Sequence, residues 1–309
     1  MTALLICMLG FAETKTLALQ IRLDQEACSC NAIDGQWGEK SATALRAYCD
    51  AKLRDPVPAL PSPSTPEEAY DRLFAGRGKP LRTVEVTERD LAALVRIPAA
   101  PADKAKLDAM GYESLPEMFA ERGHLSRRAF ERLNPGVDWE NARPGLKVVL
   151  PEFDSIESLI AFGSRPRGEK PRPYEATLIR VNLSRFTIRA YGEDGRLLAS
   201  FPCSIARDKS KVPQGELKIV TLVPWPNYTY TPDHAGSGRV TRHILPPGPN
   251  NPVGVAWMGL SLPGYGIHGT PTPESVGCAE SHGCFRLANW NAARLFAIAR
   301  IGTRVIIEP

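Results

Sequence analysis

A histidine and a cysteine a short distance apart carry the most reactive chemistry in this sequence. The segment 266–270 reads Gly-Ile-His-Gly-Thr, and thirteen residues after His268 the chain continues Ser-His-Gly-Cys over 281–284. At this composition a His-Gly-Cys triplet is expected far less than once by chance. A thiol attacks a carbonyl as the thiolate, and a nearby imidazole that accepts its proton raises the thiolate fraction. The pattern predicts a nucleophilic Cys284 with a histidine as its base.

Two histidines are candidates for that base. His282 lies only two positions from Cys284, whereas His268 on a neighbouring strand would face the thiol across a sheet. We therefore assign His268 as the base and keep His282 as a second catalytic candidate.

The residues around the cysteine suggest how a substrate would be held. Gly283 would let a substrate approach the backbone closely, and the amides of Gly283 and Cys284 are natural donors to a developing oxyanion. Arg286 would hold a substrate carboxylate or pair with an acidic neighbour, and Ser281 would orient a histidine. The candidate substrate contacts are completed by two residues flanking His268, namely Tyr265 and Gly269.

The composition narrows the class of protein. The chain has 309 residues, 43% hydrophobic and 23% charged, which excludes a mainly disordered chain and a membrane bundle. Its 38 basic and 34 acidic residues leave a net charge of +4 with no long basic run. A nucleic-acid partner is therefore not expected, because phosphate binding needs a basic stripe.

Proline-rich breaks divide the chain into segments. Many of the 28 prolines cluster at 55–66 and 165–173, and both stretches are expected to be extended, poorly packed linkers. The length favours two or three folded units. We predict a small helical N-terminal module at 16–54, a mostly helical segment at 67–164 and a mainly β domain at 174–309, a multidomain α+β architecture.

Alternating side chains predict the strands of the C-terminal domain. Apolar and polar residues alternate from Ile179 to Leu183 and from Phe186 to Ala190, with a turn at 193–195 and a return strand over 197–205. Further strands are expected at 216–223, 253–259 and 303–308, and a helix near 289–300 that Gly302 ends. In the middle segment we expect helices at 88–96 and 115–133 and a strand at 146–151.

The N-terminus and the cysteines bear on the compartment. The first twelve residues are apolar and precede polar Glu13, although no basic residue leads them, so 1–15 is a possible export signal. No other segment reaches the length of a membrane span. We expect a periplasmic or cell-envelope protein. Cys28 or Cys30 would then pair with Cys49 in a disulfide, or these cysteines are small buried apolar residues.

Two N-terminal stretches resemble cell-wall-binding modules. Asp34, Gly35, Trp37, Gly38 and Ser41 match the turn and capped helix of the peptidoglycan-binding three-helix module. The alternative is that Trp37 is the core residue of an unrelated small helical domain. The stretch 125–151 resembles the trailing half of a LysM module, without its leading signature, and a helical spacer is the alternative.

The reactive segment carries the strongest resemblance. His268 followed by Ser281-His282-Gly283-Cys284 resembles the signature of the L,D-transpeptidase (YkuD-type) catalytic domain, over about 135 residues of this chain. The run 246–252 and the segment 286–290 also fit that family. Arg286 departs from it, since several members have asparagine at this position.

The resemblance implies acyl transfer on peptidoglycan stem peptides. Cys284 would attack the carbonyl of the third stem residue, expel the terminal D-Ala and form a thioester. A second stem peptide would give a 3-3 cross-link, water would make the enzyme a carboxypeptidase, and a lipoprotein lysine would anchor that protein to the wall. The resemblance implies no cofactor. It does imply that carbapenems acylate the cysteine.

Two other interpretations remain open. His268, His282, Cys278 and Cys284 are four possible zinc ligands, although their spacing fits no closed structural site. The chain could also be a non-catalytic wall-binding protein with a degenerate C-terminal domain, against which the intact His268 and Cys284 argue. A disulfide between Cys278 and Cys284 would silence the nucleophile.

Overall fold

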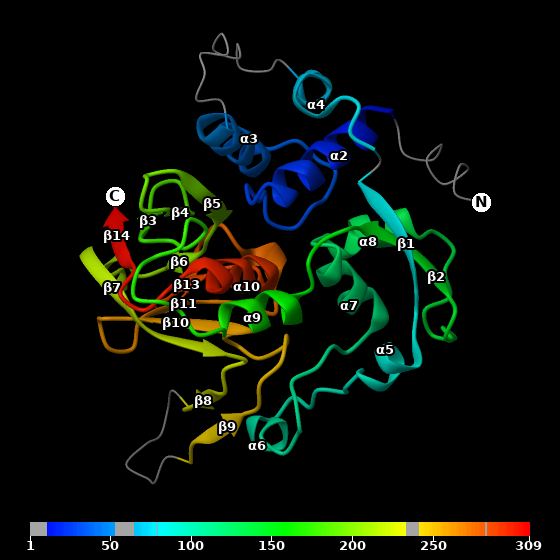
Figure 1. Cartoon of the computed structure of the whole chain (residues 1–309). Coiled ribbons are helices and arrows are strands. Elements are labelled where there is room, and N and C mark those ends of the chain that lie inside the picture. Colours follow the sequence, from blue (N-terminus) through cyan, green and yellow to red (C-terminus); the bar gives the residue numbers. More distant parts are fainter. Residues whose placement is uncertain (1–10, 53–64, 79, 233–240, 282) are drawn as a thin grey trace.

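The computed structural model describes residues 11–52, 65–78, 80–232, 241–281 and 283–309 (Figure 1). Most of the predicted export segment 1–15 and of the linker 55–66 lies outside the described residues, as do Cys7, His234 and His282.

The N-terminal half is helical with one small sheet. Its elements are α2 (Phe11–Gln25), α3 (Glu39–Lys52), α4 (Pro66–Phe74), β1 (Leu81–Glu85), α5 (Glu88–Ala92), α6 (Pro101–Lys104), α7 (Leu115–Arg122), α8 (Arg127–Leu133), β2 (Lys147–Pro151) and α9 (Ile156–Gly163). One hydrophobic cluster takes buried side chains from Leu17 through Leu150. The predicted N-terminal and middle segments therefore share a core, and the boundary between them remains a prediction.

The middle segment differs from its expected pattern in two places. The helix expected over 115–133 is two helices, each started by a serine, Ser114 and Ser126, that accepts a backbone hydrogen bond. They are separated at His124, whose φ of 52° cannot continue a helix. Strand β2 was expected, whereas its antiparallel partner β1 was not.

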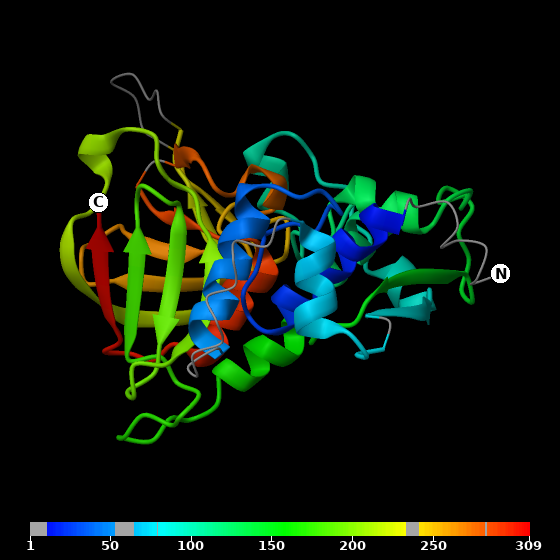
Figure 2. The same cartoon turned by 90° about the horizontal axis from the view of Figure 1, so that it is seen from above.

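The C-terminal half is a curled sheet, as expected (Figure 2). Its strands are β3 (Leu178–Asn182), β4 (Thr187–Tyr191), β5 (Leu197–Pro202), β6 (Ile205–Ala206), β7 (Gly215–Pro224), β8 (Tyr228–Tyr230), β9 (His243–Leu245), β10 (Ala256–Leu260), β11 (Gly266–His268), β12 (Ala279–Ser281), β13 (Phe285–Arg286) and β14 (Arg304–Glu308). Eight of them form one sheet in the order β13-β11-β10-β7-β14-β3-β4-β5, so the strands nearest the reactive motif lie at one edge.

Helix α10 (Asn289–Ile298) fills the core between this sheet and the N-terminal half. It packs against β10, β11 and α9, and an added Cβ at Gly163 of α9 would lie 2.6 Å from the Phe296 ring. The helix ends with its cap at Ala299, three residues before Gly302. The expectation that Gly302 ends it is wrong, because Gly302, at φ +91°, belongs to the turn into β14.

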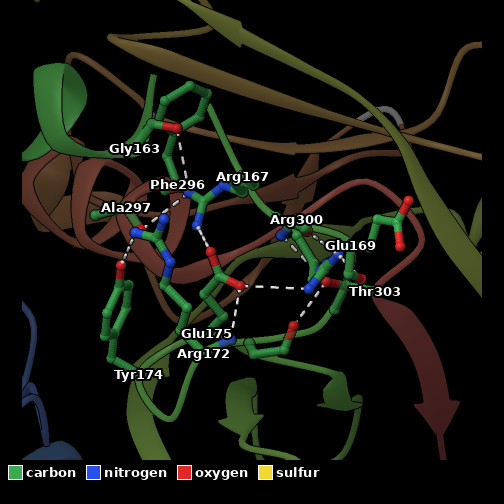
Figure 3. A network of polar contacts seen from close by, with 12 residues as sticks. Gly163, Arg167, Glu169, Arg172, Tyr174, Glu175, Phe296, Ala297, Arg300 and Thr303 are labelled. Carbon is green, nitrogen blue, oxygen red and sulfur yellow. Dashed lines mark hydrogen bonds and ion pairs between the residues drawn. The ribbon is translucent and has the colours of Figure 1, made fainter. Parts of the chain in front are cut away.

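The proline-rich stretch 165–173 is held in place by an ionic network (Figure 3). Glu175, fully buried, accepts from Arg167 at 2.8 Å and from Arg300 at 3.3 Å. The Arg167 guanidinium also donates to the carbonyls of Gly163 and Ala297, at the ends of α9 and α10. Arg167 thus ties one point of the stretch to two helix C-termini that need a donor, while most of the stretch is exposed, as expected of a linker.

Buried polar contacts join the two halves. Asp24 of α2 accepts from His124 at 2.9 Å and from Arg294 of α10 at 3.3 Å. Burial would raise the pKa of Asp24, but the His124 ring and the Arg294 guanidinium hold it below its usual value. The amide of Asn31 donates to the Pro273 carbonyl at 2.6 Å, so the N-terminal unit also reaches the loop before the reactive cysteine.

The cysteines bear on the disulfide alternatives. The structure has Cys28, Cys30, Cys49, Cys203, Cys278 and Cys284 as thiols. Neither the Cys49 pairing nor the Cys278–Cys284 disulfide is formed, and Cys28, Cys30 and Cys203 are buried as small apolar residues.

Among the described residues, the structure contains no helix with the length and apolar character that crossing a bilayer requires.

Trp37 is 38% exposed, so it is not the core residue that the alternative interpretation of the N-terminal module required.

Candidate active site

Strand pairing at the sheet edge brings the two reactive residues to one face. β11 runs parallel to β13, with Ile267 opposite Phe285 and His268 opposite Arg286. Ile267 and Phe285 are fully buried in the core of the C-terminal half. Because side chains alternate between faces, His268 and Arg286 lie on the other face, and the same alternation extended to Cys284, one residue before β13, assigns it to that face.

The Cys284 thiol lies against the backbone at the start of β11. Its Sγ donates to the Gly264 carbonyl at 3.6 Å, and the amide of Gly266 hydrogen-bonds to the sulfur. Burial raises the pKa of the thiol, while the Gly266 amide and the positive charge of Arg286 oppose that rise. Cys284 is therefore a neutral thiol at pH 7 that already has a donor and a cation placed to stabilise a thiolate.

The His268 ring is held in one tautomer. It is 5% exposed, and its Nδ1 lies 2.7 Å from the carbonyl oxygen of Gly269. A carbonyl only accepts, so Nδ1 carries the proton and Nε2 keeps its lone pair. Burial, together with the smaller effect of the Arg286 charge, lowers the pKa of His268 to about 4, and the hydrogen bond to Gly269 opposes the fall. The ring is neutral at pH 7 and able to accept a proton at Nε2.

Trp257 of β10 fixes the other side of this histidine. It lies directly opposite His268 in the antiparallel register, and the two rings stack with centroids 5.5 Å apart and planes at 20°. An added Cβ at Gly266 would lie 2.6 Å from the same indole. Gly266 is therefore required for this arrangement, since any side chain there would displace Trp257.

Tyr265 covers the glycine before the cysteine. Its Cε1 would lie 3.0 Å from a Cβ added to Gly283, so the half-buried phenol ring packs on the Gly283 backbone. The position is compatible with the expected substrate contact of Tyr265 and with a Gly283 amide next to the sulfur.

The other predicted residues lie as follows. Ser281 is the last residue of β12, which pairs with β6, and His282 is outside the described residues. Arg286 exchanges backbone hydrogen bonds with Ser204 at 2.9 and 3.0 Å. Gly269 is buried; its carbonyl accepts from His268, its amide donates to Ala256, and Asn289 of α10 packs on it.

Two residues near this site were not predicted. Asn289 packs on Gly269, and Glu121 of α7 hydrogen-bonds to Asn289. Asn289 lies in the segment 286–290 that fits the family and could have been singled out from it, whereas nothing in the sequence relates it to a residue 168 positions away. No group of three or more metal-ligating side chains occurs within the described part of the chain.

Comparison with known proteins supports the assignment of the C-terminal half. The family model described as the L,D-transpeptidase catalytic domain, YkuD, matches residues 176–307. The chain is 29% identical over 193 residues to a YkuD protein of Bacillus licheniformis, covering 62% of this chain and 93% of that protein. It is 32% identical over 147 residues to a YqjB protein of Bacillus subtilis, covering 46% and 76%.

A solved L,D-transpeptidase from Mycobacterium smegmatis is similar at 19% identity, with a TM-score of 0.34. The alignment covers 43% of this chain and 59% of that one. The family model and the curated relatives make the C-terminal half a catalytic domain of the L,D-transpeptidase class. The chain belongs to the YkuD family of L,D-transpeptidases.

Proposed function

We propose that this protein is a cysteine-dependent L,D-transpeptidase that acts on peptidoglycan stem peptides through a thioester on Cys284. The observation that carries the proposal is the parallel pairing of β11 with β13, which sets a neutral His268 beside the strand that directly follows Cys284. A neutral thiol beside a neutral imidazole suits acyl transfer, because the proton moves only as the sulfur attacks.

The first half-reaction transfers the acyl group to the sulfur. Sγ of Cys284 bonds to the carbonyl carbon of the third stem residue while Nε2 of His268 takes the thiol proton. The developing oxyanion is stabilised by the amides of Gly283 and Cys284. The carbon–nitrogen bond then breaks, His268 returns the proton to the leaving amine, and D-Ala departs from the thioester.

The second half-reaction regenerates the thiol. The side-chain amine of another stem peptide gives its proton to His268 and attacks the thioester. The carbon–sulfur bond breaks, the sulfur takes that proton from His268, and a 3-3 cross-link forms. A lipoprotein lysine in place of that amine would anchor the protein to the wall, and water would give a carboxypeptidase. This activity implies a location in the cell envelope or periplasm.

The charge of Arg286 acts in both half-reactions. Arg286 lies opposite His268 in the strand pairing, and its charge opposes the burial-driven rise in the pKa of Cys284 and adds to the lowering of the pKa of His268. A cation there favours the thiolate and can also hold a carboxylate of the stem peptide. Ser281 and His282 keep their predicted supporting roles, and Tyr265 and Gly269 their places at the substrate.

The testing experiment is incubation with tetrapeptide-containing muropeptides, followed by mass spectrometry of products and intact protein. We expect D-Ala release, cross-linked products and a thioester adduct, all lost in Cys284→Ala. The matched control is Cys278→Ala, which removes an exposed thiol six residues away and should keep full activity. An adduct on the Cys284→Ala protein would rule out the nucleophile.

The non-catalytic alternative has a distinct outcome. A wall-binding protein with a degenerate C-terminal domain would bind sacculi and leave muropeptides unchanged in the wild type. The transpeptidase proposal requires product formation that disappears in Cys284→Ala while sacculus binding persists.

A further inference from the structure

Glu121 is a buried carboxyl that reaches from the helical half to the start of α10. Its side chain is 7% exposed and accepts from the Tyr112 hydroxyl at 2.8 Å and from the Asn289 amide at 3.3 and 3.2 Å. Both of these partners are neutral. A buried carboxylate is normally paired with a cation, so the arrangement suits the protonated acid.

The charged and titratable groups around Glu121 favour the neutral form. Burial, together with the negative charges of Glu117 on α7 and Glu157 on α9, raises the pKa of Glu121 to about 8, and the hydrogen bonds from Tyr112 and Asn289 oppose the rise. The adjacent Arg122 forms an ion pair with Asp90 at 2.7 Å. Its charge also opposes the burial-driven rise in the pKa of Tyr112. Glu121 is therefore protonated at pH 7 and ionises in the mildly alkaline range.

The other end of the Asn289 side chain touches the backbone that holds the catalytic histidine. A Cβ added to Gly254 would lie 2.1 Å from Asn289 Oδ1, and one added to Gly269 would lie 2.3 Å from it. The carbonyl oxygen is thus wedged between two glycine backbones. The Asn289 amide also donates to the Pro249 carbonyl at 3.0 Å, which fixes the orientation of the side chain.

Gly269 in turn sets the tautomer of His268. Its carbonyl oxygen is the acceptor for Nδ1 at 2.7 Å, and its amide donates to Ala256 at 3.3 Å. A shift of the Gly269 peptide would turn the carbonyl and with it the imidazole, because the ring is hydrogen-bonded to this carbonyl through Nδ1.

We propose that Asn289 and Glu121 are positioning residues for the catalytic base, with neutral Glu121 holding the Asn289 side chain against the Gly269 peptide that fixes His268. This inference rests on the proposed function. Ionisation of Glu121 would place an unpaired charge in a buried site, which would open the contact to water and release Asn289. The protonation state of Glu121, in the helical N-terminal half, would then control the acylation of Cys284.

The test compares the wild type with Glu121→Gln over pH 6 to 9.5. The measurement is the rate at which a carbapenem acylates the full-length protein, together with the melting temperature at each pH. Gln keeps the shape and cannot ionise, so the two rates should agree near pH 7. At pH 9, about one unit above the pKa, about a tenth of Glu121 stays neutral, and the ratio of wild-type to Glu121→Gln rates should fall roughly tenfold.

Two further variants separate positioning from general destabilisation. Glu117→Gln removes a neighbouring negative charge that raises the pKa of Glu121, so the alkaline fall in its rate should persist and begin at a lower pH than in the wild type. Asn289→Ala should lower the rate at all pH values and remove the contrast between Glu and Gln at position 121.

The outcomes are distinct. Equal pH profiles for the wild type and Glu121→Gln would overturn the inference, as would a melting temperature that falls with pH while the rate of the folded protein does not. No acylation of the wild type at any pH would overturn the proposed function instead, and the positioning role with it.

Discussion

The indole of Trp257 and the imidazole of His268 stack with their ring centroids 5.5 Å apart, and the indole occupies the space that a side chain at Gly266 would need. The tryptophan thus supports the proposed base from the neighbouring strand and excludes water from one side of it. The stacking is possible because β10 and β11 place these two residues directly opposite each other.

Gly266→Ala should therefore disturb the site more than its size suggests. The added methyl would lie 2.6 Å from the indole, and such overpacking costs about 1–3 kcal/mol of folding stability. We expect a marked drop in the rate of carbapenem acylation, measured by intact-protein mass spectrometry, with a lowered melting temperature. The double variant with Trp257→Leu should regain stability but not rate; regained rate would show that the stacking is dispensable.

The acid limit of the reaction should follow His268. Burial lowers the pKa of His268 to about 4, so Nε2 remains a proton acceptor well below the usual histidine range. The acylation rate should fall by half near pH 4 instead of near pH 6.5. A midpoint near 6.5 would contradict the buried neutral ring.

The same group affects stability with a defined sign. Unfolded His268 takes up a proton below about pH 6.5, whereas the folded ring does so only near pH 4. Its contribution to stability is therefore complete above pH 6.5 and decreases as the pH falls toward 4. Denaturant melts of wild type and His268→Gln should converge across that interval, and a constant difference would argue against the shift.

The network around Glu175 should be sensitive to the loss of its charge. Glu175→Gln leaves Arg167 and Arg300 without their carboxylate in a site where Glu175 is fully buried, and breaking such a pair costs about 3–5 kcal/mol. Thermal unfolding measures the loss. The control is Glu216→Gln, which breaks the exposed pair with Arg304 and should change the melting temperature little.

The network also predicts a direction with pH. Burial opposes ionisation, but the Arg172 amide and the Arg167 and Arg300 guanidinium groups hold the pKa of Glu175 below its usual value. Its stabilisation is present above about pH 4.3 and is lost as the pH falls through the lower, folded value. If the wild type and Glu175→Gln differ equally at pH 7 and at pH 2, the ionic account is wrong.

The loop before the cysteine should depend on the N-terminal unit. The Asn31 amide donates to the Pro273 carbonyl at 2.6 Å, and Lys40 donates to the Val276 carbonyl. Asn31→Ala leaves the Pro273 oxygen without this donor in a buried place, at a cost of about 1–3 kcal/mol. We expect slower acylation of Cys284. The exposed Asn141→Ala should leave the acylation rate unchanged, and equal behaviour of both variants would refute the coupling.

Features with a local cause could be predicted from the sequence. Alternating apolar residues predicted β3 and β4, because burial of one sheet face repeats every second residue, and β7 and β14 were expected as strand-like stretches. The spacing of His268 and Cys284 indicated a thiol and its base, and the family match at 176–307 agrees with the resemblance. The roles of those residues remain proposals.

Tertiary structure decided what those residues face. The parallel register of β11 and β13 places Cys284 and His268 on one face, and a register shifted by one residue would separate them. The contact of Glu121 with Asn289 and the burial that neutralises both Glu121 and His268 arise from packing between distant segments. No periodicity encodes these features, since hydrophobic patterning specifies which face is buried but not which distant polar group is buried beside it.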